Sequence, residues 1–133
     1  MNMKKKYRLL IPVTILALSL SACGYISSYS ATMMVTSEWS DSASLSFWTF
    51  EGTKVLKLNN SAKTSGEVSY TAELKSGNAT VYYDDNGTKT EWFTIGAGDK
   101  LNGRAELDNS GKIYIIIETD GKCENGSFDF KLN

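Results

Sequence analysis

The chain has 133 residues, of which 41% are hydrophobic, and its formal net charge is −1. This length suits one domain with a core of its own. The chain contains no histidine, and its 15 acidic residues outnumber 14 basic ones, which are scattered after the first eight residues. Because nucleic-acid binders rely on clustered lysine and arginine, this composition excludes nucleic acid as an expected partner.

The first 22 residues have the pattern of a secretory signal. Four basic residues come before an apolar run from Leu9 to Leu20, and the small residues Ser21 and Ala22 follow. A basic start, an apolar run and small residues are typical of a signal peptide. The run is shorter than the about 20 residues of a membrane-spanning helix, and Pro12 interrupts it. We expect residues 1–22 to be a signal peptide that is removed.

The end of this signal, Leu20-Ser21-Ala22-Cys23, resembles the lipobox of bacterial lipoproteins. In that family the cysteine thiol receives a diacylglyceryl group, a dedicated peptidase cuts before it, and its amine is often acylated. Two or more acyl chains anchor a protein stably, whereas one chain does so only marginally. The resemblance implies that Cys23 is a lipid anchor, and that the protein lies in the cell envelope, held to a membrane and facing outside the cytoplasm. The alternative is ordinary secretion with a chance cysteine.

Removal of the signal would leave 111 residues, with ten basic and 15 acidic side chains and a net charge of −5. Residues 23–44 would begin with the lipidated cysteine and continue as a serine- and threonine-rich tether, flexible to about Ala31. Apolar residues near position 35 indicate an irregular first strand in this segment. Residues 45–133 would form the folded domain.

Apolar and polar side chains alternate over most of this domain, as they do in strands that are covered on one face. Serine-, asparagine- and glycine-rich turn signals separate the runs, including Ser76-Gly77, Asn86-Gly87 and Asp120-Gly121. This pattern predicts an all-β fold, an antiparallel β-sandwich of jelly-roll type with about eight strands. The runs are residues 44–50, 53–58, 67–75, 79–85, 88–95, 100–107, 112–119 and 126–132.

Residues 111–132, GKIYIIIETDGKCENGSFDFKL, are also distantly similar to the closing hairpin of bacterial pre-peptidase C-terminal domains. Those domains are small β-sandwiches appended to secreted enzymes. The resemblance depends on glycines, aromatic residues and alternation, so it implies the same fold class and no particular activity. The free thiol in this stretch, Cys123, lies in a polar context and is expected to be exposed, as an incidental thiol or part of an intermolecular bridge.

A candidate glycan site surrounds the Asn86-Gly87 turn. Tyr82 and Trp92 would lie on the two strands that the turn joins, and flat aromatic rings can stack on sugars. Asp84, Asp85 and Asn86 would supply carboxylate and amide acceptors. The alternative is that the aromatic residues belong to the core. The same acidic turn could suit calcium, but it offers too few oxygens for that ion, so no metal and no cofactor are expected.

No sequence motif of a hydrolase, a phosphate-binding loop or a zinc site is present. The leading interpretation is a non-enzymatic envelope module that binds a ligand or supports an envelope structure, with a glycan or an envelope protein as partner. Two alternatives remain, namely a small hydrolase that uses two of the acidic side chains and a protein–protein interaction module.

Replacement of the proposed anchor tests the first part of this interpretation. We expect Cys23→Ala to abolish incorporation of labelled fatty acid, because the substitution removes the thiol that would carry the lipid. The variant should accumulate as uncut precursor or as a released form. A Cys23→Ala protein that is processed and fractionates with membranes like the parent would contradict lipidation.

Overall fold

The computed structural model describes residues 25–60, 66–108 and 111–133, and this part of the chain consists of strands, turns and loops. No helix within these ranges is long and apolar enough to cross a membrane. The strands are β1 (Ser28–Thr32), β2 (Val35–Glu38), β3 (Ser42–Asn59), β4 (Glu67–Asp84), β5 (Thr90–Ile95), β6 (Asp99–Glu106) and β7 (Lys112–Leu132).

Three of these strands are long and bent. β3 and β4 each have 18 residues and β7 has 21, whereas strands of five or six residues are usual. The register with β7 shifts between Phe50 and Thr53 in β3, and between Ser76 and Asn78 in β4. Such irregularities increase the local bend of a strand while its hydrogen-bonded ladder continues on both sides.

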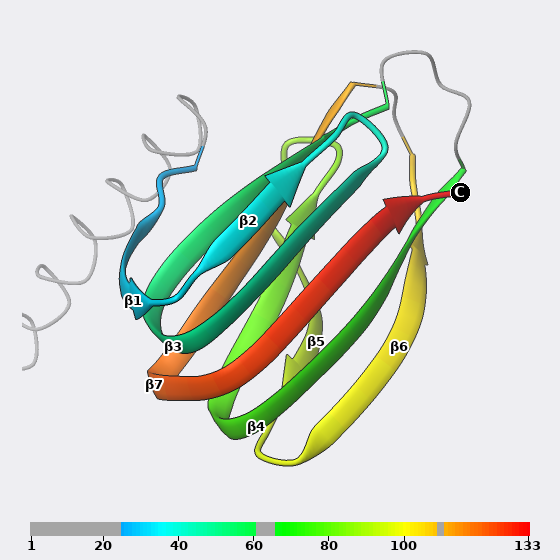
Figure 1. Cartoon of the computed structure of the whole chain (residues 1–133). Helices are drawn as coiled ribbons and strands as arrows, with labels where there is room; N and C mark the ends of the chain where they lie inside the picture. The colour runs from blue at the N-terminus through cyan, green and yellow to red at the C-terminus, as the bar shows by residue number, and fades with distance from the viewer. Residues whose placement is uncertain (1–24, 61–65, 109–110) are drawn as a thin grey trace, which may run out of the picture.

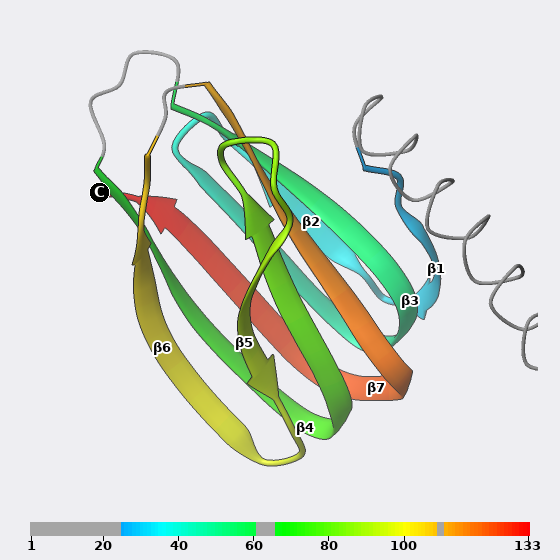
Figure 2. The same ribbon diagram turned by 180° about the vertical axis from the view of Figure 1, so that it is seen from behind.

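Because of these bends, each long strand contributes to two layers. The front layer has the order β2-β3-β7-β4-β6 and contains the first halves of β3 and β4 and the second half of β7 (Figure 1). The back layer has the order β1-β3-β7-β4-β5 and contains the other halves (Figure 2). All pairs are antiparallel, so the predicted all-β, antiparallel sandwich is confirmed.

The strand boundaries differ from the expected ones. Six of the eight alternating runs merge in pairs into β3, β4 and β7, because the turn signals Ser76-Gly77 and Asp120-Gly121 lie at bends within continuous strands. Both glycines have positive φ, which lets the chain bend without a hairpin. The sandwich also begins earlier than residue 45, since β1 pairs with β3 from Ser28 onward. The expected flexible tether to Ala31 is therefore shorter.

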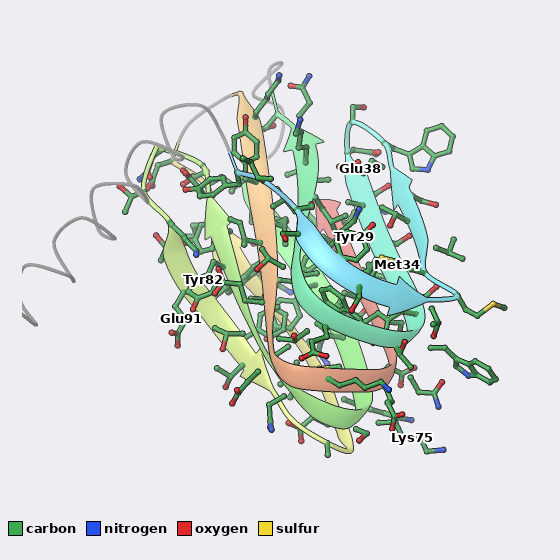
Figure 3. The ribbon with its side chains drawn as sticks, turned by 90° about the vertical axis from the view of Figure 1, so that its left-hand side faces the viewer. Tyr29, Met34, Glu38, Lys75, Tyr82 and Glu91 are labelled. Carbon is green, nitrogen blue, oxygen red and sulfur yellow. The ribbon has the colours of Figure 1, made fainter. Side chains whose placement is uncertain are left out.

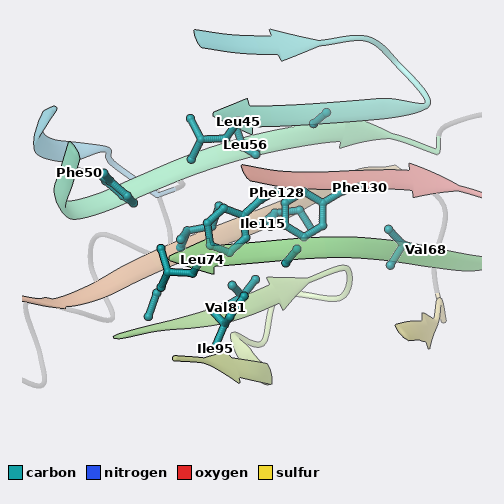
Figure 4. Close-up of a cluster of buried hydrophobic side chains, with 14 of the residues drawn as sticks. Leu45, Phe50, Leu56, Val68, Leu74, Val81, Ile95, Ile115, Phe128 and Phe130 are labelled. Carbon is teal, nitrogen blue, oxygen red and sulfur yellow. The ribbon is translucent and has the colours of Figure 1, made fainter. Parts of the chain in front are cut away.

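The core lies between the two layers and comes from the inward-facing positions of the long strands (Figure 4). In β7, for example, Ile113, Ile115 and Ile117 in the back layer and Phe128 and Phe130 in the front layer are buried. The intervening side chains face outward, as the period of two in a strand requires.

Cys123 belongs to this core, and the expectation of an exposed thiol is wrong. Its exposed fraction is 0%, and its thiol donates to the backbone oxygen of Asn78 across 3.3 Å. Burial raises the pKa of the thiol, so the reactive thiolate form is disfavoured. The residues around Cys123 are polar because β7 bends there and exposes them. At this bend the Cys123 side chain itself points inward and contacts β4.

The bend of β4 depends on Gly77. Its φ is +102°, and a Cβ atom there would lie 2.8 Å from the Cα of Cys123. We expect Gly77→Ala to lower the free energy of unfolding by about 2–4 kcal/mol, from backbone strain together with overpacking. Urea denaturation followed by tryptophan fluorescence measures this change.

Gly87→Ala is the matched control. Gly87 also has a positive φ, of +95°, but a Cβ atom there would meet nothing within 4 Å. Gly87→Ala should therefore lower the free energy of unfolding by the backbone strain alone, about 1–2 kcal/mol. Equal losses of stability in the two variants would contradict the packing role of Gly77.

Candidate functional site

Trp92, expected to stack on a ligand, points into the sandwich. A bulge in the pairing of β4 with β5 leaves Trp92 without a partner between Glu91 and Phe93. Its ring lies 4.9 Å from the ring of Tyr70 and 5.9 Å from that of Phe130, measured between centroids. Trp92 is thus a half-buried residue packed against the core.

Tyr82 faces the opposite way, on the outer surface of the back layer (Figure 3). It pairs with Ile116, which is almost fully buried on that surface, and the Lys89 ammonium lies 4.3 Å from the Tyr82 ring centre. Burial raises the pKa of Tyr82, and the negative charges of Glu118 and Glu91 add to this shift while Lys89 opposes it. The structure therefore does not bring Tyr82 and Trp92 together on one face.

The side chain of Asp84 is buried and orders the turn between β4 and β5. Its carboxylate accepts hydrogen bonds from the backbone nitrogens of Asn86 and Gly87, at 3.1 and 2.6 Å. It also accepts one from the Tyr25 hydroxyl at 2.6 Å. These three donors, together with its burial, leave Asp84 little surface for a ligand.

The other two predicted residues also have local partners. The Asp85 carboxylate accepts from the backbone nitrogen of Asp108 at 2.6 Å, and the Asn86 side chain accepts from that of Thr88 at 3.1 Å. In the described part of the chain, no group of three or more acidic or thiol side chains is placed to hold a metal ion. Of the five predicted residues, Asp84, Asp85 and Asn86 support the turn, Trp92 packs against the core and Tyr82 faces outward on the back layer. They share no common surface, and the glycan site expected there stays a prediction.

The outer surface of the front layer offers a different site. Here β4 and β7 run side by side down the middle of the layer that faces the viewer in Figure 1, so their outward side chains form two adjacent rows. We call these eight residues the front track. They are Ser69, Thr71, Glu73 and Lys75 of β4 and Asn125, Ser127, Asp129 and Lys131 of β7.

One end of the front track is hollowed and carries an exposed tryptophan. The hollow has a volume of about 480 Å³ and is lined by Trp39, by serines of β2 and β3, and by Thr71 and Asp129 of the track. The Trp39 side chain is 71% exposed. Among the described residues, no hydrogen bond or ion pair engages the side chains of Ser44, Thr71 or Asp129, so their polar atoms are available to a ligand.

Trp39 is held on a fixed turn between β2 and β3. Its backbone nitrogen donates to the oxygen of Ser42 at 2.7 Å. The backbone oxygen of Ser40 accepts a hydrogen bond from the backbone nitrogen of Asn59 in the back layer, at 2.8 Å. That of Asp41 accepts one from the backbone nitrogen of Leu132 in the front layer, also at 2.8 Å. A ring mounted on an ordered turn loses less freedom on binding than one on a mobile loop.

The front track also brings two carboxylates near each other. Asp129 pairs with Thr71, and Glu73 lies two residues further along the same face. Both are exposed, and the Lys100 ammonium lies 3.7 Å from the Glu73 carboxylate. The acid of a glycosidase is kept protonated by an apolar, dry setting, and neither carboxylate has such a setting.

Sequence reasoning overlooked this surface because serine carries little chemical signal by itself. The alternation in residues 42–46, SASLS, does predict that three serines share an outward face. What the sequence did not reveal is that β7 and β4 place Asp129 and Thr71 beside them. Those pairings join residues about 60 to 90 positions apart in the chain.

No family model matches the chain, and no curated protein sequence matches it. Among solved structures, the chain is similar to PliG of Salmonella Typhimurium, a periplasmic lysozyme inhibitor of g-type lysozyme, with 14% identity and a TM-score of 0.48 over 73% of this chain and 92% of that one. PliG of Aeromonas hydrophila shows 17% identity and a TM-score of 0.45 over 71% and 88% of the chains.

A third similar structure is the module CsCBM6-3 of Clostridium stercorarium, solved in complex with cellobiose. Its identity is 9% and its TM-score 0.39, over 80% of this chain and 86% of that one. The three likenesses are remote, and they do not extend to a ligand or a partner of this chain.

The structural role of Asp84 can be separated from a role in binding. We expect Asp84→Ala to lower the free energy of unfolding by about 1–3 kcal/mol, because the Tyr25 hydroxyl and two backbone nitrogens lose their acceptor. Asn86→Ala, on the exposed tip of the same turn, should change stability by no more than about 0.5 kcal/mol. Thermal or urea denaturation measures both. An Asp84→Ala variant with parental stability would contradict the structural role.

Proposed function

We propose that this protein is a lipid-anchored, non-enzymatic binding module that faces outside the cytoplasm and holds a glycan in the hollow beside Trp39, at one end of the front track. The observation that carries the binding part is the hollow of about 480 Å³, in which an exposed indole ring borders hydroxyl groups and a carboxylate. The anchoring part depends on the lipobox-like sequence before Cys23.

The chemistry of the hollow suits a sugar. A sugar ring has an apolar face, which stacks on a flat aromatic ring, and a rim of hydroxyl groups that need donors and acceptors. Trp39 supplies the flat face, while Ser44, Thr71 and Asp129 supply polar atoms that protein groups do not use. The volume also lies within the usual range of ligand sites, about 300–1,000 Å³.

The position of the first described residues is compatible with this arrangement. The Tyr25 ring lies 5.4 Å from that of Tyr114, and Ser27 accepts a hydrogen bond from the backbone nitrogen of Val55 at 2.9 Å. Tyr114 and Val55 are both in the back layer. The described chain therefore begins on the side of the back layer, and an anchor that precedes it is compatible with an open front track.

A protein partner is the second candidate, and a separate feature favours it. Met33, Val35 and Trp48 are 75%, 61% and 63% exposed. Val35 begins β2, Met33 lies between β1 and β2, and Trp48 lies in β3 just beyond its pairing with β2. A hollow of about 250 Å³ lies between Met33 and Trp48. Exposed apolar groups of this kind mark protein contact sites in many soluble proteins.

The two candidates predict opposite effects of two tryptophan variants. Oligosaccharides of glucose, mannose and N-acetylglucosamine, and peptidoglycan fragments, are screened by tryptophan fluorescence and calorimetry. We expect Trp39→Ala to weaken binding of the hits by at least about tenfold, since truncation of a central aromatic contact is usually this costly. Trp48→Ala is the matched control, because it removes an equally exposed indole outside the hollow.

Two results would contradict glycan binding beside Trp39. A screen without hits, or hits that bind Trp39→Ala as tightly as the parent, would remove the proposal. Loss of a protein partner on Trp48→Ala but not on Trp39→Ala would favour the second candidate instead. Both variants should keep parental stability, since both side chains are mostly exposed.

A further inference from the structure

The hollow beside Trp39 is the first of three that follow one another along the front track. A second hollow, of about 300 Å³, shares Thr71 and Asp129 with the first. A third, of about 420 Å³, shares Glu73, Lys100 and Ser127 with the second and reaches Lys75 and Asn125 at the bend of the layer. Because neighbouring hollows share lining residues, they lie next to one another, and we call the row of three the depression.

The direction of this depression follows the strands. The walls of the three hollows include the outward side chains of β4 in order, Ser69, Thr71, Glu73 and then Lys75. The six steps along the strand from Ser69 to Lys75 span roughly 20 Å, at about 3.3 Å per residue. A single sugar ring beside Trp39 would occupy only the first third of this length.

The two ends of the depression differ in chemistry. Trp39 gives the first end an aromatic wall. The far end has charged walls, with Glu73 and Lys100 paired at 3.7 Å and with Lys75 and Asp99 nearby. The middle hollow borders the same Glu73–Lys100 pair and adds the Asp129 carboxylate and the hydroxyl groups of Ser127 and Thr71. The far end therefore offers both donors and acceptors and favours no ligand of a single charge sign.

From this geometry we infer that the ligand is the interior of a linear glycan chain, which lies along β4 and β7 and occupies all three hollows. The inference rests on the proposed glycan binding at Trp39 and extends it from one sugar to a polymer. A terminal sugar or a disaccharide would leave the charged far end empty. Affinity should therefore rise with chain length until the depression is filled.

A length series tests the inference with defined probes. The dimer and the hexamer of glucose, mannose and N-acetylglucosamine are titrated into the protein by calorimetry. For the sugar that binds best, we expect the hexamer to bind at least about tenfold more tightly than the dimer.

A blocking variant then locates the gain. Ser127 faces outward in the middle of the depression, so Ser127→Tyr should place a ring across it. We expect this change to remove most of the advantage of the hexamer and to leave the affinity for the dimer within about twofold. Thr94→Tyr, on an exposed position of β5 in the back layer, is the matched control and should change neither affinity.

A second variant tests the far end independently, in case Ser127→Tyr does not fold. The double substitution Glu73→Ala with Lys75→Ala shortens two exposed side chains at the far end and removes the exposed ion pair of Glu73 with Lys100. It should weaken the hexamer severalfold and spare the dimer. Thermal unfolding of each variant shows whether its fold is intact.

The outcomes separate the two proposals. Equal affinity for dimer and hexamer, or a hexamer that binds Ser127→Tyr and the double variant as tightly as the parent, would overturn the extended site and leave binding at Trp39 in place. Absence of binding by every probe would overturn the glycan proposal, and the extended site with it.

Discussion

The whole structure depends on the ladder that β7 makes with β3 on one side and β4 on the other. This pairing continues from the back layer into the front layer, so each of the three strands serves as a central strand twice. A central strand in both layers must be apolar on its inward face along its whole length, and β7 is buried at alternate positions through most of its length. The short strands β1, β2, β5 and β6 only extend the two layers at their edges.

The bends needed by this ladder restrict the residues around them. A Cβ atom at Gly77 would meet the backbone of Cys123, and one at Gly126 would lie 2.5 Å from the Phe47 ring. The small residues thus let the two layers pack closely where β3, β4 and β7 turn. On the outer surface no such restriction applies. Serine, threonine and charged side chains can occupy every second position of β4 and β7, and there they form the front track.

The fold class was predictable from the sequence because a period of two is a local property of the chain. The places where strands bend rather than end were not, since Ser76-Gly77 and Asp120-Gly121 have the composition of ordinary turns. Burial of Cys123 was missed for the same reason. Near Asn86-Gly87, the acidic and aromatic residues that predicted a ligand site have structural roles. Asp84 orders the turn, and Trp92 packs against the core. The front track depends on long-range pairings that no local pattern contains.

The contact between Tyr25 and Asp84 also bears on the two proposals together, a lipid at Cys23 and a long glycan as ligand. Only Gly24 separates Tyr25 from Cys23, and two residues of extended chain span at most about 7 Å. An anchor at Cys23 would therefore act as a short pivot, and the domain would be confined to a thin layer next to the lipid. Copies in that layer could diffuse in two dimensions and engage one long glycan together. Each further contact would then form at a high effective concentration, so that weak single sites could hold the polymer firmly.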